Sequence, residues 1–283
     1  MIKDVTDTAI WVATYRAEET QRQDALFRDP FALQLIGDQG PDIAKRTQGS
    51  RYTAWSVVIR TRIIDEMILQ LTKQGVDTVL NLGAGLDTRP YRLDLPTNLR
   101  WIEIDFNNII DLKNEKMKSH IPHCRLERIK LDLSITSVRN DLFKAINKES
   151  KSVLILTEGV IPYLSNLEAG SLASALYDNL NFHYWITEYY SPEILEFLRT
   201  PKRLKQMENA PFLFYPEDWF AFFKQNGWCQ ATTKYFGVES KKWGRTPPTP
   251  GWLKKNVEFM NEENLKAVHS YLGYTLYHRS SLF

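Results

Sequence analysis

The feature that most constrains the fold is a short apolar run that ends in a glycine turn. Residues 76–82 read Val-Asp-Thr-Val-Leu-Asn-Leu and lead into Gly83, Ala84 and Gly85. The apolar positions suit a strand that is buried on both faces of a parallel sheet. Glycines let the backbone bend tightly and approach a ligand without a side chain in between. We therefore predict a strand followed by a ligand-binding turn.

A second predicted strand, residues 100–105, ends in an acid. Asp105 follows Gly83 by about twenty residues, the spacing at which a carboxylate accepts hydrogen bonds from a ribose diol. The turn reads Gly-x-Gly-x-x-Thr and lacks the third glycine that packs a helix over a pyrophosphate. The pattern favours a nucleoside without a pyrophosphate, such as S-adenosylmethionine, over a dinucleotide. A lone Gly-x-Gly is also compatible with an ordinary turn.

Predicted strands and helices alternate from residue 76 onward, which indicates a doubly wound, mostly parallel α/β sheet. The predicted strands are 76–82, 100–105, 125–131, 152–158, 183–189, 229–236 and 271–279, and the main helices between them lie near 106–117, 137–147, 166–180, 192–208 and 216–226. Residues 4–72 look helical throughout, with a long helix from Arg51 to Lys73. We expect one domain, with residues 1–73 as a helical N-terminal cap and residues 74–283 as a Rossmann-like core.

Three motifs together resemble the leucine carboxyl methyltransferase family. They are Asn-Leu-Gly-Ala-Gly-Leu-Asp-Thr-Arg at 81–89, Ile-Asp-Phe at 104–106 and Thr-Glu-Gly-Val-Ile-Pro-Tyr-Leu at 157–164. The resemblance runs from about Thr8 to Tyr190, and the remainder matches only in layout. It implies a class I S-adenosylmethionine-dependent methyltransferase of the branch that includes bacterial O-methyltransferases, with S-adenosylhomocysteine as product. It also implies seven strands in the order 3-2-1-4-5-7-6, ending in an antiparallel hairpin.

Acids end three neighbouring predicted strands, at Asp105, Asp132 and Glu158. Ligands of such sheets lie beyond the carboxyl ends of the strands, and buried carboxylates are costly without partners, so these acids indicate a binding site. The resemblance supports Asp105 at the ribose, Asp132 and Leu133 at the adenine, and Glu158 at the methionine amino group or sulfonium. Simpler roles remain open, because Asp132 can cap the next helix and Glu158 can bind turn amides.

Basic and aromatic residues extend the predicted site. Arg60 is expected to bind the methionine carboxylate of the cofactor, with solvation as the alternative. The resemblance also implies a basic residue from the N-terminal segment, and Arg16 is its nearest match. The acceptor pocket is predicted at Tyr163, Tyr189 and Tyr190, together with a loop from Phe236 to Trp252. For Tyr189, Tyr190 and the loop tryptophans plain packing is the alternative, and the Pro-rich part of the loop, residues 246–251, is either a lid or a rigid connection.

Composition narrows the class of protein. The 283 residues are 43% hydrophobic and 25% charged, as in ordinary soluble domains. A net charge of +2 without a basic tract gives no indication of a nucleic-acid partner. No apolar run is long enough to span a membrane, and no signal peptide or metal-ligand spacing is evident. Two separated cysteines fit a reducing cytoplasm, while the oligomeric state stays open.

The predicted chemistry is O-methylation of a small-molecule acceptor, for example a polyketide-like compound. None of the five histidines falls at a predicted strand tip that faces the predicted pocket. Because an ionised carboxylate needs no general base, this favours a carboxylate or acidic hydroxyl acceptor, and no catalytic residue is assigned. The alternatives are methylation of a protein C-terminal carboxylate, a nicotinamide-dependent oxidoreductase, and a non-catalytic cofactor-binding module.

Overall fold

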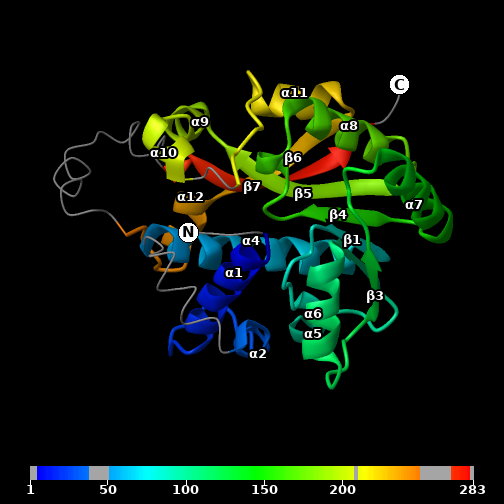
Figure 1. Ribbon diagram of the computed structural model, residues 1–283, viewed down its shortest axis with the longest axis horizontal. Coiled ribbons are helices and arrows are strands. Elements are labelled where there is room, and N and C mark those ends of the chain that lie inside the picture. The colour runs from blue at the N-terminus through cyan, green and yellow to red at the C-terminus, as the bar shows by residue number, and fades with distance from the viewer. Residues whose placement is uncertain (1–4, 38–50, 207–209, 249–268, 281–283) are drawn as a thin grey trace.

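The computed structural model describes residues 5–37, 51–206, 210–248 and 269–280, and its centre is a seven-stranded sheet (Figure 1). The strands are β1 Thr78–Leu82, β2 Arg100–Asp105, β3 Arg125–Lys130, β4 Val153–Thr157, β5 Phe182–Tyr190, β6 Trp228–Tyr235 and β7 Leu272–Arg279. Their order is β3-β2-β1-β4-β5-β7-β6, which confirms the predicted topology. β7 runs antiparallel to both β5 and β6, as the expected terminal hairpin requires.

The register of the sheet sets the position of the predicted site. In the parallel pairs of β1, Leu82 lies opposite Ile104 of β2 and Thr157 of β4. These strands therefore end at one level, and the residues that follow them share one edge. Gly83, Asp105 and Glu158 each come one position later, so three of the predicted ligand-binding residues begin at the same edge.

Helices cover both faces of the sheet. They are α1 Val5–Thr20, α2 Ala32–Ile36, α4 Arg51–Lys73, α5 Arg89–Arg92, α6 Asn107–Met117, α7 Thr136–Glu149, α8 Asn166–Tyr177, α9 Pro192–Leu198, α10 Pro201–Gln206, α11 Trp219–Gln225 and α12 Phe236–Lys242, with a 3-10 turn at Ile161–Tyr163. Alternate residues of β1 point to opposite faces of the sheet. Leu80 and Leu82 pack in a core with α7, α8 and α11, whereas Val79 packs with α4. Figure 1 shows α8 and α11 on one side of the sheet and α4 and α6 on the other.

The N-terminal helices match the prediction only in part. α4 has the predicted bounds, Arg51–Lys73, but helix is interrupted between Thr20 and Ala32. Helix resumes after Asp29, whose Oδ1 accepts a 3.1 Å hydrogen bond from the N–H of Ala32 at the start of α2. The expectation of helix throughout 4–72 is therefore wrong at this turn.

Two C-terminal expectations also change. The predicted helix 192–208 is two helices, α9 and α10, because Pro201 interrupts the hydrogen-bond pattern and begins the second. The predicted loop after Phe236 begins with helix α12 instead. The end of that predicted loop, including Trp252 and residues 249–251 of the Pro-rich segment, lies outside the described residues.

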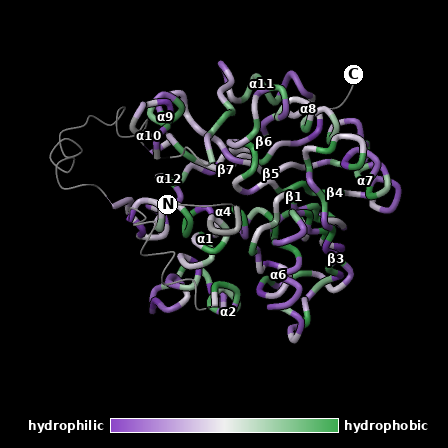
Figure 2. The backbone as a smooth tube through the Cα atoms, in the orientation of Figure 1, coloured by the Kyte–Doolittle hydropathy of each residue, from purple (hydrophilic) through white to green (hydrophobic). Residues whose placement is uncertain are grey.

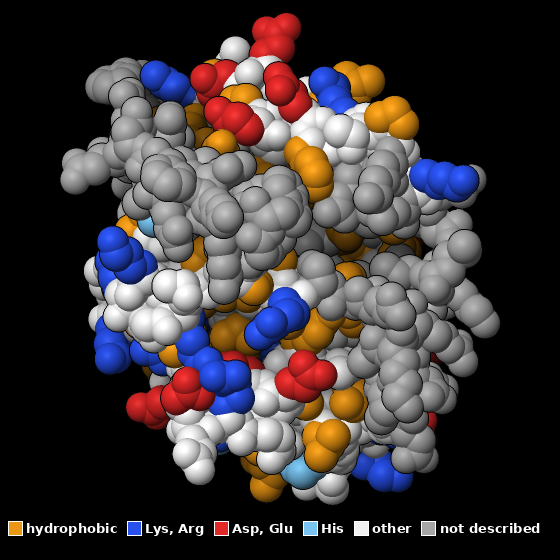
Figure 3. Space-filling view, turned by 90° about the vertical axis from the view of Figure 1, so that its left-hand side faces the viewer, with side chains coloured by type: hydrophobic (Ala, Val, Ile, Leu, Met, Phe, Trp, Pro, Cys, Tyr) orange, Lys and Arg blue, Asp and Glu red, His pale blue; other side chains and the backbone are white. Residues whose placement is uncertain are grey.

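The surface fits the near-neutral net charge. Figure 2 shows hydrophobic residues on the central strands and hydrophilic residues mainly on the outer turns and helix faces. On the face in Figure 3, positive and negative side chains are interspersed around hydrophobic ones. Within the described ranges, no helix has the length and apolar character needed to cross a bilayer.

Candidate active site

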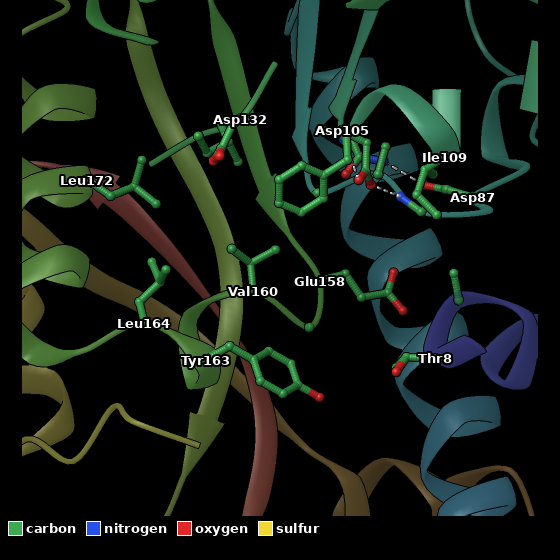
Figure 4. Close-up of a pocket in the computed structure, with 18 of the residues that line it drawn as sticks. Thr8, Asp87, Asp105, Ile109, Asp132, Glu158, Val160, Tyr163, Leu164 and Leu172 are labelled. Carbon is green, nitrogen blue, oxygen red and sulfur yellow. Dashed lines mark hydrogen bonds between the residues drawn. The ribbon is translucent and has the colours of Figure 1, made fainter. Parts of the chain in front are cut away.

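A cavity of about 770 Å³ lies at the carboxyl ends of β1 to β4, a volume in the ~300–1,000 Å³ range of small-molecule sites. Its lining comes from α1, α4, the turns after these four strands, α8 and residues 210–213. Figure 4 shows Glu158 and Val160 near its middle, Asp105 and Asp87 to one side, and Leu164 and Leu172 to the other. The site is thus assembled from segments far apart in sequence.

The cavity brings together the residues predicted to bind the cofactor. These are Arg16, Arg60, Gly83, Ala84, Gly85, Asp105, Asp132, Leu133 and Glu158, and all of them line it. Tyr163 lines it as well, with its hydroxyl directed into the space between Glu158 and Thr8 (Figure 4). Whether each residue contacts a ligand stays a prediction, but their convergence on one cavity is a property of the fold.

The glycine turn and Asp105 form one hydrogen-bonded unit. Gly83 and Gly85 have φ of 67° and 49°, which only glycine adopts readily. The N–H of Gly85 donates to Oδ2 of Asp105 over 2.7 Å, and the N–H of Phe106 donates to Oδ1 over 2.7 Å. Burial raises the pKa of Asp105, and the two amide bonds oppose this by stabilising the charged form. Each carboxylate oxygen retains a lone pair for a further donor such as a ribose hydroxyl.

Glu158 is held between two arginines. Nη1 of Arg89 donates to Oε2 of Glu158 over 2.8 Å, and Nε of Arg60 lies 2.9 Å from Oε1. Burial alone would raise the pKa of Glu158, but Arg89 and Arg60 hold it below its usual range, so the residue is ionised. Arg89 thus pairs with a carboxylate at the edge of the sheet.

A buried network of ion pairs and hydrogen bonds holds Arg89 in position. Its Nε donates to Oδ1 of Asp65 over 2.7 Å, and its Nη1 lies 2.9 Å from Oδ2 of Asp87. Asn81 donates to the same oxygen of Asp87 over 2.9 Å, and Arg92 binds Asp65 through two nitrogens. Asp65, Asn81 and Arg92 were not predicted as members of this network. Asp65 lies 24 positions from Arg89 and 27 from Arg92 in the chain, and nothing local marks these pairings.

Arg16 anchors α1 to the glycine turn. Its Nε donates to Oδ2 of Asp29 over 2.8 Å, and its Nη2 donates to the carbonyl of Leu86 over 2.5 Å. The side chain lines the cavity but already has an anionic partner. In this structure Arg16 therefore fixes the N-terminal helix against the turn, in addition to any contact with a ligand.

The turn after β3 and Tyr163 complete the lining. Oδ1 of Asp132 accepts the N–H of Ser134 over 2.9 Å, while α7 begins without a side-chain cap, so Asp132 shapes the turn rather than capping that helix. Burial raises the pKa of Tyr163, which keeps its hydroxyl neutral.

Tyr189 and Tyr190 lie elsewhere, outside the cavity lining. The ring of Tyr189 stacks on Phe220 with centroids 4.8 Å apart, and Tyr190 packs on Trp219. Their aromatic character therefore serves packing here, which was the stated alternative.

Several lining residues were missed from the sequence. They are Phe106 and Ile109 after β2, Arg139 of α7, Leu167, Ser171 and Leu172 of α8, and Ala210, Pro211 and Leu213. Helical apolar residues signal a core face equally well, so periodicity could not separate lining from core. No histidine is among the lining residues that the structure describes, and no cluster of metal-ligating side chains occurs in those parts of the chain.

The chain matches a protein-family model and several curated relatives. Its residues 9–177 match the model of the leucine carboxyl methyltransferase family. A candidate S-adenosyl-L-methionine-dependent methyltransferase of Streptomyces avermitilis is 31% identical over 166 residues, which are 56% of this chain and 59% of that protein. A similarly named protein of Frankia alni is 33% identical over 170 residues, 56% of this chain and 58% of that protein. The chain thus matches under two thirds of the length of these relatives.

Two solved structures share the fold. A DUF574 family protein from Streptomyces avermitilis superimposes with a TM-score of 0.58 at 12% identity, covering 95% of this chain and 97% of that one. A candidate methyltransferase from Thermobifida fusca gives 0.56 at 14% identity, with 95% and 94% covered. The fold, the cavity at the carboxyl ends of its strands and the match over residues 9–177 together show that the chain belongs to the leucine carboxyl methyltransferase family.

Proposed function

We propose that the protein transfers a methyl group from S-adenosylmethionine to an oxygen of a small-molecule acceptor. The observation that carries this proposal is the convergence of the glycine turn, Asp105 and Glu158 on one cavity that also contains Arg60. Family membership and the names of the curated relatives support the same reaction class. A nicotinamide cofactor fits less well, because the turn lacks the third glycine that packs over a pyrophosphate.

The residues present fit this cofactor. Asp105 has acceptor capacity for ribose hydroxyls, and the turn at Gly83 and Gly85 exposes backbone rather than side chain to the cavity. Arg60 lies within ion-pair distance of Glu158, yet its buried Nε makes no aligned hydrogen bond in the described residues. The guanidinium of Arg60 can therefore bind an additional carboxylate, such as that of the methionine part of the cofactor.

S-adenosylmethionine supplies an electrophilic methyl group on a sulfonium. The protein's task is to orient the acceptor oxygen and to exclude water, because displacement at such a methyl group needs little acid catalysis. Glu158 is ionised and lies near the middle of the cavity, where Arg89 and Arg60 already balance its charge, so a cationic group there would share this carboxylate with them. Tyr163 is neutral and can donate a hydrogen bond to the acceptor.

The acceptor side of the cavity is apolar. Val160, Leu164, Leu167, Leu172 and Leu213 line it, which supports a small organic acceptor rather than a nucleic acid or a membrane surface. The absence of histidine from the described lining favours an acceptor that is already ionised, such as a carboxylate, over an alcohol. A protein C-terminal carboxylate is the second candidate, since it has the same reactive group.

Two measurements test the proposal. Calorimetric titration with S-adenosylhomocysteine should show micromolar binding, with NADH as the matched comparison. Binding of NADH and not of S-adenosylhomocysteine would reverse the assignment. Incubation of the protein with methyl-deuterated S-adenosylmethionine and a small-molecule cell extract should then give a labelled product by mass spectrometry. Cofactor binding without any labelled product from small-molecule or protein fractions would favour the non-catalytic module.

A further inference from the structure

Glu188, near the end of β5, is a buried carboxylate that the proposed chemistry does not use. It is 3% exposed and lies outside the cavity lining. The donors that bind its side chain in the described parts of the chain are neutral. Oε1 accepts hydrogen bonds from the N–H of Gly159 and, over 3.2 Å, from the hydroxyl of Tyr274, and Oε2 accepts one from the hydroxyl of Thr187 over 2.9 Å. Burial of a carboxylate is costly, so its presence here requires a reason.

The hydrogen bond to Gly159 links Glu188 to the turn that carries Glu158. Gly159 has a φ of 74° and lines the cavity. Its N–H belongs to the peptide group that follows Glu158, so this bond fixes a peptide plane on which the direction of the Glu158 side chain depends. Leu156 of β4 pairs with Ile186 of β5, and Glu188 therefore lies two residues past that pair, beside the turn.

Glu188 is itself fixed within the sheet. It pairs with Tyr274 of the antiparallel strand β7, and its carbonyl accepts a 3.1 Å hydrogen bond from Nε1 of Trp219. Both of these aromatic residues are buried. The turn that Glu188 holds faces the cavity instead, because Figure 4 shows Glu158 and Val160 near the middle of that space. A carboxylate anchored in the sheet thus fixes a segment that borders the ligand site.

We propose that Glu188 is a positioning residue, whose hydrogen bond to Gly159 directs Glu158 towards the charged end of S-adenosylmethionine. The operative element is the hydrogen bond rather than the charge of Glu188, since any oxygen at the position of Oε1 can accept the same N–H. Burial raises the pKa of Glu188, and the amide of Gly159 opposes this by stabilising the charged form. The inference rests on the proposed function, because it adds a residue to that same site.

Two ligands measure this role in the full chain, S-adenosylmethionine and 5′-methylthioadenosine. The second has the adenine, ribose and sulfur of the first, but it lacks the positive charge on sulfur and the amino-acid part. Calorimetric titration gives both affinities. Their ratio reports the contacts made to the charged end of the cofactor, because a general loss of cavity structure lowers both affinities together.

Glu188→Ala should lower this ratio about tenfold relative to the wild type, because the amide of Gly159 loses its acceptor and the turn shifts. Glu196→Ala is the matched control, because Glu196 is an exposed glutamate of α9 outside the cavity lining, and its ratio should equal that of the wild type. Circular dichroism ensures that each variant is folded. An unchanged ratio in folded Glu188→Ala would overturn the positioning role.

Two conservative variants separate the hydrogen bond from the charge. Glu188→Gln keeps an oxygen for Gly159, and its amide group can donate to the hydroxyl of Thr187, so the ratio should stay within about threefold of the wild type. Glu188→Asp keeps the charge but is one methylene shorter, and it should lower the ratio as Glu188→Ala does. The opposite order of these two variants, or equal ratios in both, would overturn the role. This comparison decides the question by itself if Glu188→Ala does not fold.

A double-mutant cycle tests whether Glu188 acts through Glu158. Glu158→Gln should also lower the ratio, and adding Glu188→Ala to it should lower the ratio no further, because residues that act as one unit are not additive. Two decreases that multiply would overturn the positioning role, and so would a wild-type ratio in Glu158→Gln.

The wild type separates this inference from the proposed function. Failure of S-adenosylmethionine to bind the wild type would remove the proposed function. Binding of S-adenosylmethionine to the wild type, with the same ratio in folded Glu188→Ala, would remove only the role of Glu188 and leave the cofactor assignment in place.

Discussion

Asp105, at the end of β2, accepts a 2.7 Å hydrogen bond from the N–H of Gly85, in the turn that follows β1. The acid and the turn are therefore fixed to each other in the protein alone. A ligand that binds both does not have to order them, and preorganisation of this kind reduces the entropy lost on binding. The position of Asp105 thus depends on the turn geometry as well as on its own strand.

We expect Asp105→Asn to weaken S-adenosylhomocysteine binding by roughly 1.5–3 kcal/mol, because hydrogen bonds to an ionised group are lost. Calorimetric titration measures the change. Asp111→Asn is the matched control, because Asp111 is exposed and lies outside the cavity lining. Equal affinity in Asp105→Asn and wild type would remove Asp105 from the ribose site.

The pH dependence of binding tests the same residue. Burial raises the pKa of Asp105 above the usual aspartate value, and ribose hydroxyls would stabilise its charged form. Affinity should therefore be complete above this raised pKa and should fall as the pH decreases through it. The decrease should be much smaller in Asp105→Asn. Circular dichroism at each pH ensures that the protein remains folded.

The turn itself gives a prediction about stability. A Cβ on Gly83 would lie 2.7 Å from Cγ2 of Val160, and the φ of +67° is unfavourable for alanine. Gly244 has a similar φ of +65° with nothing within 4 Å of such a Cβ, so it reports the backbone effect alone. Gly244→Ala should cost roughly 1–2 kcal/mol of unfolding free energy. Gly83→Ala should cost about 1–3 kcal/mol more, from crowding against Val160.

Urea denaturation of both glycine variants measures these changes. Gly83→Ala should also lower S-adenosylhomocysteine affinity, since Val160 lines the same cavity. If the two variants lose equal stability, the contact between Gly83 and Val160 has no energetic effect, and the turn is constrained only by its backbone angle.

The strand-end residues of the site were predictable from the residues themselves, whereas the strand order was implied by the family resemblance. Strands buried on both faces are mainly apolar. β1, Thr-Val-Leu-Asn-Leu, is buried at every position, and the glycine turn after Leu82 marked its end. Parallel strands end at a common edge, which is why Asp105 and Glu158 could be assigned to one site before their distances were known. These features depend on local sequence and on one general rule of α/β sheets.

The contacts between distant segments were not predictable. Asp65 is one charged residue among several on α4, and nothing local indicates that it binds Arg89 and Arg92. Arg139 has an ordinary position in an amphipathic helix, and only the tertiary structure shows that it is buried with no carboxylate of the described residues at ion-pair distance. Tyr190 follows a strand as a pocket residue would, but packing on Trp219 determines its position.

The ionic network should make the protein sensitive to acid. Burial alone would raise the pKa of Asp87, but Arg89 and Lys113 bring it down to about 2, below the value near 3.8 of an unfolded aspartate. The contribution of Asp87 to stability is therefore complete above the unfolded value and is lost as the pH falls towards the folded value. Asp87→Asn should be roughly 1.5–3 kcal/mol less stable than the wild type at pH 7. As the pH falls from about 4 to about 2, the variant should lose less unfolding free energy than the wild type does.

Denaturant titrations at several pH values measure the unfolding free energies of Asp87→Asn and the wild type. Asp141→Asn is a suitable control, because Asp141 is exposed and its contact with Lys144 is 3.8 Å long. An equal pH dependence in Asp87→Asn and wild type would mean that other carboxylates account for the acid sensitivity.

Tyr163 provides the test of the acceptor side. Its neutral hydroxyl is directed into the cavity, so it can donate to the acceptor but is not required by the predicted cofactor contacts. Tyr163→Phe should therefore lower the yield of labelled product in the extract assay by about tenfold, with unchanged S-adenosylhomocysteine affinity. Tyr189→Phe is the matched control, because Tyr189 packs on Phe220 outside the cavity lining. Equal product from both variants would mean that Tyr163 only contributes apolar surface, whereas loss of cofactor affinity in Tyr163→Phe would move it to the cofactor side.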